Sequence, residues 1–250
     1  MSPPLVSLRA IQVEYSTADG PLVAVQNVDL DLQEGEFLVL VGPSGCGKST
    51  LLQVIAGLVQ PTGGRLSYAG GGSGQQIGVV FQRPVLLPWR TVMENVMLPV
   101  QALKLDRAKY RANALQLLEM LGLAGFANRY PYELSGGMQQ RASIARALVH
   151  EPSVVLMDEP FSALDAITRE QLNGELRRLW RETGKTVLFV THSIPEAVFL
   201  GTRVVVMSPR PGRICDLVEI DMPQERDMAM TTGAQFGAYV DQIRTRLEGR

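Results

Sequence analysis

The sequence contains little cysteine, and neither sign of charge is in excess. Its two cysteines, Cys46 and Cys215, are far apart, so they show neither the spacing of a zinc site nor a disulfide framework. The 24 lysines and arginines nearly balance the 25 aspartates and glutamates, whereas nucleic-acid-binding domains usually carry a strong basic excess. These two scarcities favour a reducing compartment and weigh against direct binding of nucleic acid.

Long hydrophobic runs are also missing. The apolar stretches Phe37–Val41 and Val204–Met207 are far shorter than the roughly 18 residues that span a bilayer. Residues 1–16 have neither the basic segment nor the apolar segment of a secretory signal peptide. We therefore expect any membrane role of this chain to depend on a partner protein.

What the sequence does contain is an ordinary globular composition, 46% apolar and 20% charged. Alternating apolar residues predict strands at residues 6–15 and 23–32, joined as an antiparallel hairpin or meander. From Val154 to Met207 strands alternate with helices, which predicts an α/β fold with a parallel, helix-covered sheet. The strands expected there are Val154–Met157, Val187–Thr191 and Arg203–Met207, and the helices are Ala166–Thr183 and Pro195–Leu200.

The remaining segments are predicted from the same periodicities. Residues 92–126 and Ser135–Leu148 have a helical pattern, and the glycine run Gly70–Gly74 predicts a surface turn. We expect a solvated charged face on the helix at residues 169–185, and a surface position for His150. The charged residues of that helix are Glu175, Arg177, Arg178, Arg181 and Glu182.

A glycine-rich loop follows the apolar run at 37–41 and precedes a helical stretch. It reads GPSGCGKS, which fits the phosphate-binding pattern G-x-x-x-x-G-K-[ST] in the expected strand–loop–helix context. Glycines let several backbone N–H groups point at one anion, and the helix N-terminus adds a positive dipole end. We predict that Lys48 reaches the β- and γ-phosphates, Ser49 ligates Mg²⁺ and Thr50 donates to the α-phosphate. The predicted nucleotide-binding residues are Gly42, Pro43, Ser44, Gly45, Cys46, Gly47, Lys48, Ser49 and Thr50, with Cys46 as a filler.

Two carboxylates end the apolar run VVLMDE at Val154–Glu159. A buried strand that ends in aspartate places a charge at the carboxyl edge of the sheet, where ligands bind in open α/β folds. Asp158 suits Mg²⁺, and Glu159 suits the general base that activates the attacking water. Together with the upstream loop, this pair predicts a site that hydrolyses a nucleoside triphosphate.

The segment LSGGMQQR at Leu134–Arg141 resembles the signature sequence of ATP-binding cassette (ABC) ATPases. Physically, Ser135, Gly136 and Gly137 open a helix and offer a hydroxyl, bare N–H groups and a dipole end to an anion. The resemblance implies that these residues clamp the γ-phosphate of ATP bound to the opposite subunit of a dimer. It therefore predicts a homodimer that encloses ATP and Mg²⁺.

Four further positions match motifs of this family. The resemblance implies that Tyr15 stacks on adenine and that Gln82 senses Mg²⁺ and the reacting water. Ser162–Asp165 resembles the D-loop, with Asp165 near the nucleotide, and His192 matches the switch histidine that contacts the γ-phosphate. Two positions depart from the usual pattern, since Met138 stands where glutamine is common and Ser193 where aspartate is frequent. Neither change removes a group with an assigned chemical role.

The resemblance also implies an architecture. We expect an α/β P-loop NTPase fold of the ABC type, with a mixed sheet, an antiparallel β subdomain and an inserted helical subdomain at about residues 90–150. The ABC domain would span residues 5–220, and residues 221–250 would form a C-terminal extension. The activity implied is ATP hydrolysis coupled to transport.

The loop after Gln82 carries the bulky residues Leu86, Leu87 and Trp89, which pack either on the protein's own core or against a partner. In the family this region accepts a membrane permease. LLPW after Gln82, LDAITR at Leu164–Arg169 and MSPRPGRI at Met207–Ile214 together resemble the nitrate/sulfonate/taurine importers. The implied cargo is a sulfonate such as taurine, then nitrate or a small organic precursor. The implied setting is the cytoplasmic face of the bacterial inner membrane, with a periplasmic solute-binding protein as an indirect partner.

Three other readings fit the sequence less well. Soluble ABC ATPases of translation or nucleic-acid machines usually carry two cassettes or a long coiled-coil insertion, and this chain shows neither. A non-catalytic nucleotide sensor would not need intact Lys48, Asp158, Glu159 and His192. Exporter halves commonly fuse the cassette to membrane helices.

Overall fold

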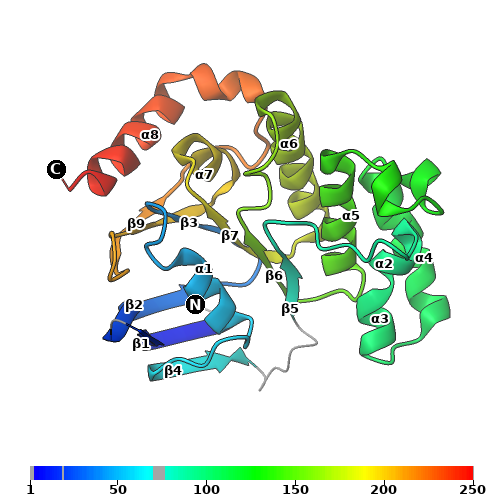
Figure 1. Cartoon of the computed structure of the whole chain (residues 1–250). Coiled ribbons are helices and arrows are strands. Elements are labelled where there is room, and N and C mark those ends of the chain that lie inside the picture. Colours follow the sequence, from blue (N-terminus) through cyan, green and yellow to red (C-terminus); the bar gives the residue numbers. More distant parts are fainter. Residues whose placement is uncertain (1–2, 19, 70–76, 250) are drawn as a thin grey trace.

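In the computed structural model, residues 3–18, 20–69 and 77–249 are described, and the predicted turn at Gly70–Gly74 lies outside them. Two sheets, a layer of helices and a separate group of helices make up the molecule (Figure 1). Within the described part of the chain, no helix is long and apolar enough to cross a membrane.

The smaller sheet is antiparallel and has the strand order β2-β1-β4. β1 (Val6–Thr17) pairs with β2 (Gly20–Leu32) on one side and with β4 (Gly63–Tyr68) on the other. Alternate apolar residues of β1, such as Val6, Leu8 and Val13, are buried, as expected of a strand with one face on the core. The antiparallel pairing predicted for the first two strands is confirmed.

The larger sheet has six strands in the order β5-β6-β7-β3-β8-β9. It is parallel except at its edge, where β9 runs antiparallel to β8, so it is a mixed sheet. Its strands are β3 (Phe37–Val41), β5 (Ile77–Val80), β6 (Val154–Asp158), β7 (Thr186–Thr191), β8 (Arg203–Met207) and β9 (Ile214–Glu219).

The central strands end at the same edge of this sheet. Val41 of β3 pairs with Thr191 of β7, and Val190 pairs with Asp158 of β6. The loops that follow these three strands therefore leave the sheet side by side. That register brings residues far apart in sequence to one place.

Successive residues of β3 face two different apolar cores. Leu38 and Leu40 pack in a cluster with the antiparallel sheet and α1 (Lys48–Ile55), whereas Val39 and Val41 pack in a second cluster. This second cluster includes residues of α6 (Ala166–Thr183), α7 (Ile194–Leu200) and α8 (Ala234–Leu247). A strand that is buried on both faces explains why its sequence is apolar throughout rather than alternating.

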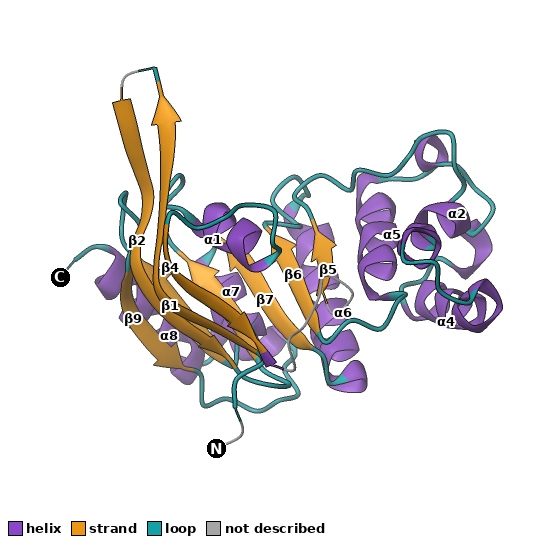
Figure 2. Cartoon of the chain, turned by 90° about the horizontal axis from the view of Figure 1, so that it is seen from below, coloured by secondary structure: helices purple, strands orange, loops and turns teal. Residues whose placement is uncertain are grey.

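The helical group lies to one side of the larger sheet, beyond β5 (Figure 2). It contains α2 (Val92–Val96), α3 (Leu98–Ala102), α4 (Arg107–Met120) and α5 (Gly136–Leu148), with short 3₁₀ turns at Ala124–Phe126 and Pro131–Glu133. The predicted helical character is confirmed. The stretch 92–126 is nevertheless divided into two five-residue helices, α2 and α3, and the longer α4, and α3 has proline in its first turn.

The predicted solvated face of α6 is found at Arg178 and Glu182, which are exposed and form an i,i+4 ion pair. The surface predictions for Arg177, which the C-terminal segment covers, and for His150 are wrong. Arg177 is 2% exposed, and its guanidinium stacks 4.6 Å from the centre of the Trp180 ring. It donates to the carbonyls of Leu200 and Gln224, so this position belongs to a buried contact and not to a solvated face. His150 is also buried; its Nε2 lies 3.3 Å from the carbonyl oxygen of Ile77, and burial lowers its pKa.

Arg226 makes the second basic contact to α7. Its Nη1 donates to the carbonyls of Val198, Phe199 and Gly201 at 2.7, 3.1 and 2.9 Å. Beyond it a 3₁₀ turn (Met228–Thr232) leads into α8, whose Phe236, Val240 and Ile243 enter the same core as α7. We call Arg177 and Arg226 the C-terminal arginine clamp.

Candidate functional site

The phosphate loop connects β3 to α1. Gly47 is the N-cap residue of α1 and has φ 102°, and a Cβ there would stand 2.8 Å from the carbonyl oxygen of Ala24. Only glycine fits both the left-handed backbone and this close approach. No side chain caps α1, so the first N–H groups of this helix are left for a ligand.

Lys48 lies at the start of α1 with only 4% of its surface exposed. Its ammonium donates to the carbonyls of Gly42 at 2.8 Å and Pro43 at 2.9 Å. Both partners are neutral, and no ion pair of Lys48 with a carboxylate is found among the described residues. A buried cation beside a helix N-terminus has a strong electrostatic preference for an anion.

Ser49 and Asp158 are in direct contact. The Ser49 hydroxyl donates to Oδ1 of Asp158 at 2.8 Å, so the first turn of α1 meets the end of β6. Burial raises the pKa of Asp158, and the hydrogen bond from Ser49 opposes that rise. A hydroxyl and a carboxylate are hard oxygen donors of the kind that Mg²⁺ prefers, so these two residues fit a magnesium ion.

Glu159 and His192 form a second pair at the same sheet edge. Nδ1 of His192 lies 3.1 Å from Oε2 of Glu159. Glu159 has φ 42°, and its backbone N–H donates to the carbonyl of Val190 at 3.0 Å. Positive φ values are uncommon in residues other than glycine and cluster at functional sites. Here the two neighbouring carboxylates have different partners, because Asp158 contacts Ser49 whereas Glu159 contacts His192.

Gln82 joins this pair through Ser162. Its Nε2 donates to the Ser162 hydroxyl at 3.1 Å, and that hydroxyl donates to the carbonyl of Glu159 at 2.9 Å. These two hydrogen bonds connect the loop after β5 to the backbone of Glu159, whose side chain contacts His192. Among the described residues, the side chain of Gln82 bonds to Ser162 and not to Ser49 or Asp158.

A cavity of about 210 Å³ is lined by eight of the residues predicted from sequence. Tyr15, which is 36% exposed, lines it together with Lys48 and Glu159. Sequence reasoning missed Leu22, Ala24 and Arg210. The full lining is Tyr15, Leu22, Ala24, Ser44, Gly45, Gly47, Lys48, Ser49, Thr50, Glu159 and Arg210.

Three residues of the phosphate loop that were predicted to bind the nucleotide do not line the cavity. Gly42 and Pro43 offer carbonyls to Lys48 and do not line the cavity. The side chain of Cys46 is 1% exposed within the core, and burial raises the pKa of its thiol. Its thiol is therefore a core group, in agreement with its interpretation as a filler.

The signature residues do not line this cavity. Ser135 is the N-cap of α5, and its hydroxyl accepts the N–H of Met138 at 3.3 Å. Asp165 caps α6 and accepts both the N–H and the hydroxyl of Thr168 at 3.0 and 2.6 Å, which lowers the pKa of its carboxyl. One chain therefore brings the phosphate loop, both carboxylates and His192 together, but leaves Ser135, Gly136, Gly137 and Asp165 outside.

The loop that carries the bulky residues is held rigidly from two sides. Asn95, wholly buried in α2, accepts the N–H of Leu87 at 2.7 Å and donates to its carbonyl at 3.1 Å. Arg146 of α5 donates to the carbonyls of Pro84 and Val85. Leu86 packs on the core, whereas Trp89 is 70% exposed. The loop thus presents Trp89 outward from a fixed backbone.

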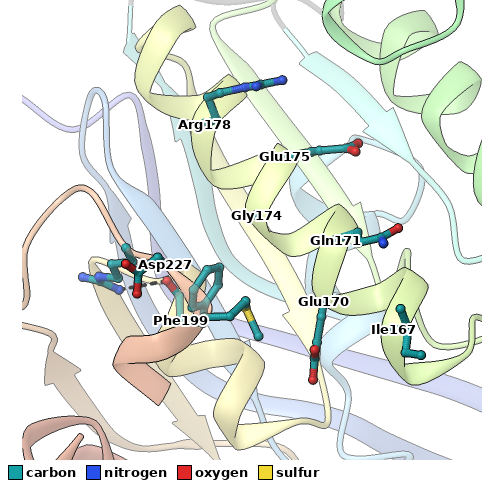
Figure 3. A pocket seen from close by; sticks show the side chains of 10 residues that line it. Ile167, Glu170, Gln171, Gly174, Glu175, Arg178, Phe199 and Asp227 are labelled. Atoms are coloured by element: carbon teal, nitrogen blue, oxygen red, sulfur yellow. Dashed lines mark hydrogen bonds between the residues drawn. The ribbon is translucent and has the colours of Figure 1, made fainter. Parts of the chain in front are cut away.

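A separate hollow of about 490 Å³ lies between α6, α7 and the C-terminal segment. Figure 3 shows Ile167, Glu170 and Glu175 along one helix, with Phe199 and Asp227 on the opposite side. None of the nucleotide-binding, metal-binding or catalytic residues predicted from sequence lines it. The candidate functional site is therefore the smaller cavity at the sheet edge, where the charged groups converge.

Comparisons with known proteins point to one family. The profile described as "ABC transporter" matches residues 25–162. An uncharacterized ABC transporter ATP-binding protein of Methanocaldococcus jannaschii is 51% identical over 223 residues, which are 88% of this chain and 82% of that protein. The taurine import ATP-binding protein TauB of Rhizobium johnstonii is 50% identical over 201 residues, covering 79% of this chain and 77% of that protein.

A solved structure supports the same comparison. The ATP-binding cassette MJ0796, in a dimeric post-hydrolysis state bound to ADP and Pi, is similar with a TM-score of 0.75 and 36% identity. The similarity covers 87% of this chain and 100% of that one. The predicted architecture of mixed sheet, antiparallel sheet and helical group is thereby confirmed.

Proposed function

Because this chain belongs to the ABC transporter family, we propose that it is the ATP-hydrolysing subunit of an importer for a sulfonate such as taurine. The observation that carries the proposal is the 50% identity with a taurine import ATP-binding protein over most of both chains. The contact of Ser49 with Asp158, the contact of Glu159 with His192 and the buried Lys48 ammonium in the phosphate loop support the hydrolytic role. The alternative of a soluble nucleic-acid or translation machine has no comparable support.

The proposed binding of ATP follows the cavity from Tyr15 to Lys48. Tyr15 stacks on adenine, the α1 N-terminus and Thr50 hold the phosphates, and Lys48 turns from its two carbonyl partners to the β- and γ-phosphates. Mg²⁺ held by Ser49 and Asp158, with Gln82 near it, would neutralise the charge that develops on the phosphates. Supporting this assignment, Lys48 has only neutral partners and Ser49 already contacts Asp158.

In the proposed hydrolysis, Glu159 accepts a proton from the attacking water. The hydrogen bond from His192 orients the Glu159 carboxylate, and Gln82 is connected through Ser162 to the backbone carbonyl of Glu159. We assign His192 to contact the γ-phosphate when ATP is present. Positioning of the water and the phosphate by these three side chains accounts for the rate.

The site is completed by a second copy of the chain. Ser135, Gly136 and Gly137 lie outside the cavity of their own chain, and the related cassette bound to ADP and Pi is dimeric. We propose that these residues and Asp165 of one subunit approach the nucleotide held by the other. ATP then bridges the two subunits, and hydrolysis releases them.

Coupling to transport is proposed to run through the loop that presents Trp89. Its exposed ring, with Leu86 and Leu87 beside it, would contact an integral membrane permease, so the subunit works at the cytoplasmic face of the bacterial inner membrane. A periplasmic solute-binding protein would deliver the cargo. Recognition of the cargo is then the task of those partners.

The hydrolytic assignment is tested by Glu159→Gln, with Glu182→Gln on the exposed face of α6 as the control. Loss of the base should lower ATP hydrolysis by roughly 10²–10⁴-fold, and the variant should elute as an ATP-loaded dimer in gel filtration. The control should hydrolyse ATP at the wild-type rate. Wild-type turnover by Glu159→Gln would show that Glu159 is not the base.

The transport assignment is tested in proteoliposomes that hold the complete importer. Uptake of radiolabelled taurine, driven by ATP, is compared with uptake of nitrate. Trp89→Ala should reduce uptake while the isolated subunit still binds ATP, and Leu58→Ala, an exposed leucine after α1, serves as control. Taurine uptake that does not exceed background would refute the cargo, and unchanged uptake by Trp89→Ala would refute the contact.

A further inference from the structure

The turn between β8 and β9 lies directly against the phosphate loop. Gly212 of this turn donates its N–H to the carbonyl of Ala24 at 3.0 Å, and its own carbonyl accepts the N–H of Gln26 at 2.9 Å. Across the turn, the N–H of Ser208 donates to the carbonyl of Arg213 at 2.9 Å. The position of this turn relative to β2 is therefore set by backbone hydrogen bonds.

Gly212 also touches the phosphate loop itself. A Cβ at this residue would stand 1.9 Å from the carbonyl oxygen of Cys46, closer than any real contact. Only glycine allows the turn to approach this near. The backbone of the turn thus packs directly against the phosphate loop, and one residue of the turn lines the nucleotide cavity.

Arg210 is the side chain that this wall brings into the cavity. Its Nε donates to the carbonyl of Gly45 at 3.2 Å, and it lines the same cavity as Tyr15, Lys48 and Thr50. Its Nη2 lies 3.3 Å from the place where a Cβ of Gly45 would stand. No ion pair between Arg210 and a carboxylate is found in the part of the chain that the structure describes.

We propose that Arg210 binds the phosphate chain of the nucleotide, as a second cation opposite Lys48. The inference rests on the proposed function, because it requires a nucleoside triphosphate in this cavity. A guanidinium is planar, always charged and able to form two parallel hydrogen bonds to phosphate oxygens. Nε is bonded to Gly45, which fixes the group while the two terminal nitrogens stay available to an anion.

The environment favours this role over that of an ordinary solvated arginine. Arg213, three residues on, illustrates the ordinary case, since its Nη2 donates to the Gln26 side chain at 2.7 Å and it does not line the cavity. Arg210 is instead tied to a loop whose N–H groups serve anions. Burial of its charge by a bound nucleotide would strengthen the interaction, because the local dielectric falls.

The test measures binding of ATP and of tripolyphosphate by titration calorimetry. Four proteins are compared: the wild type, Arg210→Ala, Arg210→Lys and the control Arg213→Ala. We expect Arg210→Ala to weaken both ligands about tenfold, a change typical of one charged hydrogen-bonded contact. Arg210→Lys should recover part of the loss, because a point charge remains without the paired geometry. Arg213→Ala should bind both ligands as the wild type does.

The outcomes separate the possible failures. If Arg210→Ala weakens ATP and leaves tripolyphosphate unchanged, its contact is with the base or ribose and the inference is wrong. If neither affinity changes, Arg210 is a solvated surface residue and the inference is also wrong. If the wild-type protein binds neither ligand, the proposed function is wrong, and so is the phosphate-binding role of Arg210 that depends on it. Arg210 is exposed, so circular dichroism should confirm an unchanged fold.

Discussion

The phosphate loop and the C-terminal arginine clamp both place basic side chains on backbone carbonyls, yet the two regions do opposite things. Lys48 stands at the N-terminus of α1, the positive end of a helix, and borders an open cavity. Arg177 and Arg226 stand at the C-terminus of α7, the negative end, and are closed over by the chain. A cation at the positive end of a helix is available to bind an anion, whereas a cation at the negative end is already paired with the helix carbonyls.

One helix links the two regions. α7 begins at Ile194, two residues after His192, and ends at Leu200, whose carbonyl Arg177 holds. The clamp thus fixes the end of α7 that is remote from the nucleotide cavity. The comparison teaches that the same donor–acceptor chemistry serves binding or fastening according to the local helix dipole and the room left for a ligand.

The largest expected effect comes from removing the cation at the positive end. Lys48→Ala should lower ATP hydrolysis by about 10²–10³-fold, as loss of a group that stabilises transition-state charge typically does. Its nucleotide-free stability should not fall, because the ammonium is buried at the positive end of α1, where this unfavourable position offsets its two hydrogen bonds to carbonyls. Steady-state kinetics measures the loss of ATP hydrolysis, and thermal unfolding without nucleotide measures the stability. A lower melting temperature without nucleotide would break the comparison, since Lys48 would then also be a fastening group.

Removing the cation at the negative end should do the reverse. Arg226→Met takes away three charged hydrogen bonds to the last turn of α7, and we expect the free energy of unfolding to fall by about 3 kcal/mol. ATP affinity should stay within about twofold of the wild type. Denaturant unfolding measures the first effect, with the exposed Arg244→Met as control. If Arg226→Met were as stable as the wild type but bound ATP poorly, the clamp would serve nucleotide binding and not stability, contrary to our assignment.

An anion should stabilise one region only. At about a hundred times its dissociation constant, tripolyphosphate should add about 2.7 kcal/mol to the stability of the wild type and of Arg226→Met. Lys48→Ala should show little of this gain, because the anion has lost its nearest cation. The shift in melting temperature with ligand concentration is the measurement. An equal shift in Lys48→Ala would place the anion elsewhere on the protein.

The smallest expected effect concerns Glu196, which lies on α7 between the two regions. Burial raises the pKa of its carboxyl, although Thr191 donates a hydrogen bond to it at 2.5 Å. The folded protein therefore holds this proton more tightly than the unfolded chain, so stability is lost as the pH rises from the unfolded pKa of about 4.5 through the folded pKa.

Glu196→Gln removes the titrating group and keeps a polar side chain of the same size. The stability of this variant relative to the wild type should increase from pH 4 to pH 7. Urea unfolding across this pH range tests the sign. A relative stability that decreases toward pH 7 would mean that the ionised carboxylate is favoured in the fold.

Much of the candidate site was predictable from local sequence. Lys48, Ser49, Asp158 and Glu159 were assigned because a glycine-rich loop after one strand and two carboxylates after another must meet at the carboxyl edge of a parallel sheet. The structure does bring these residues together. Their chemical roles in hydrolysis remain predictions.

Other residues could not be placed in the same way. Arg210 looks like any arginine of a polar turn, and its position depends on the contact of Gly212 with Cys46, residues far apart in sequence. Arg177 has the spacing of a solvated helix face, and only the C-terminal segment that covers α6 makes it a buried residue. In the sequence, Asn95 is only a polar residue within a predicted helix. The structure shows that its side chain makes four hydrogen bonds to the preceding loop.

The sequence by itself determined the elements, the phosphate loop and the family, because periodicity, turn residues and motif spacing act over short stretches of chain. Only the tertiary structure decided which cations are reserved for a ligand and which fasten the fold. The physical reason is that the free energy of a charged group depends on its burial, on nearby helix ends and on the carbonyls that surround it. Those neighbours come from distant parts of the chain and are set only when it folds.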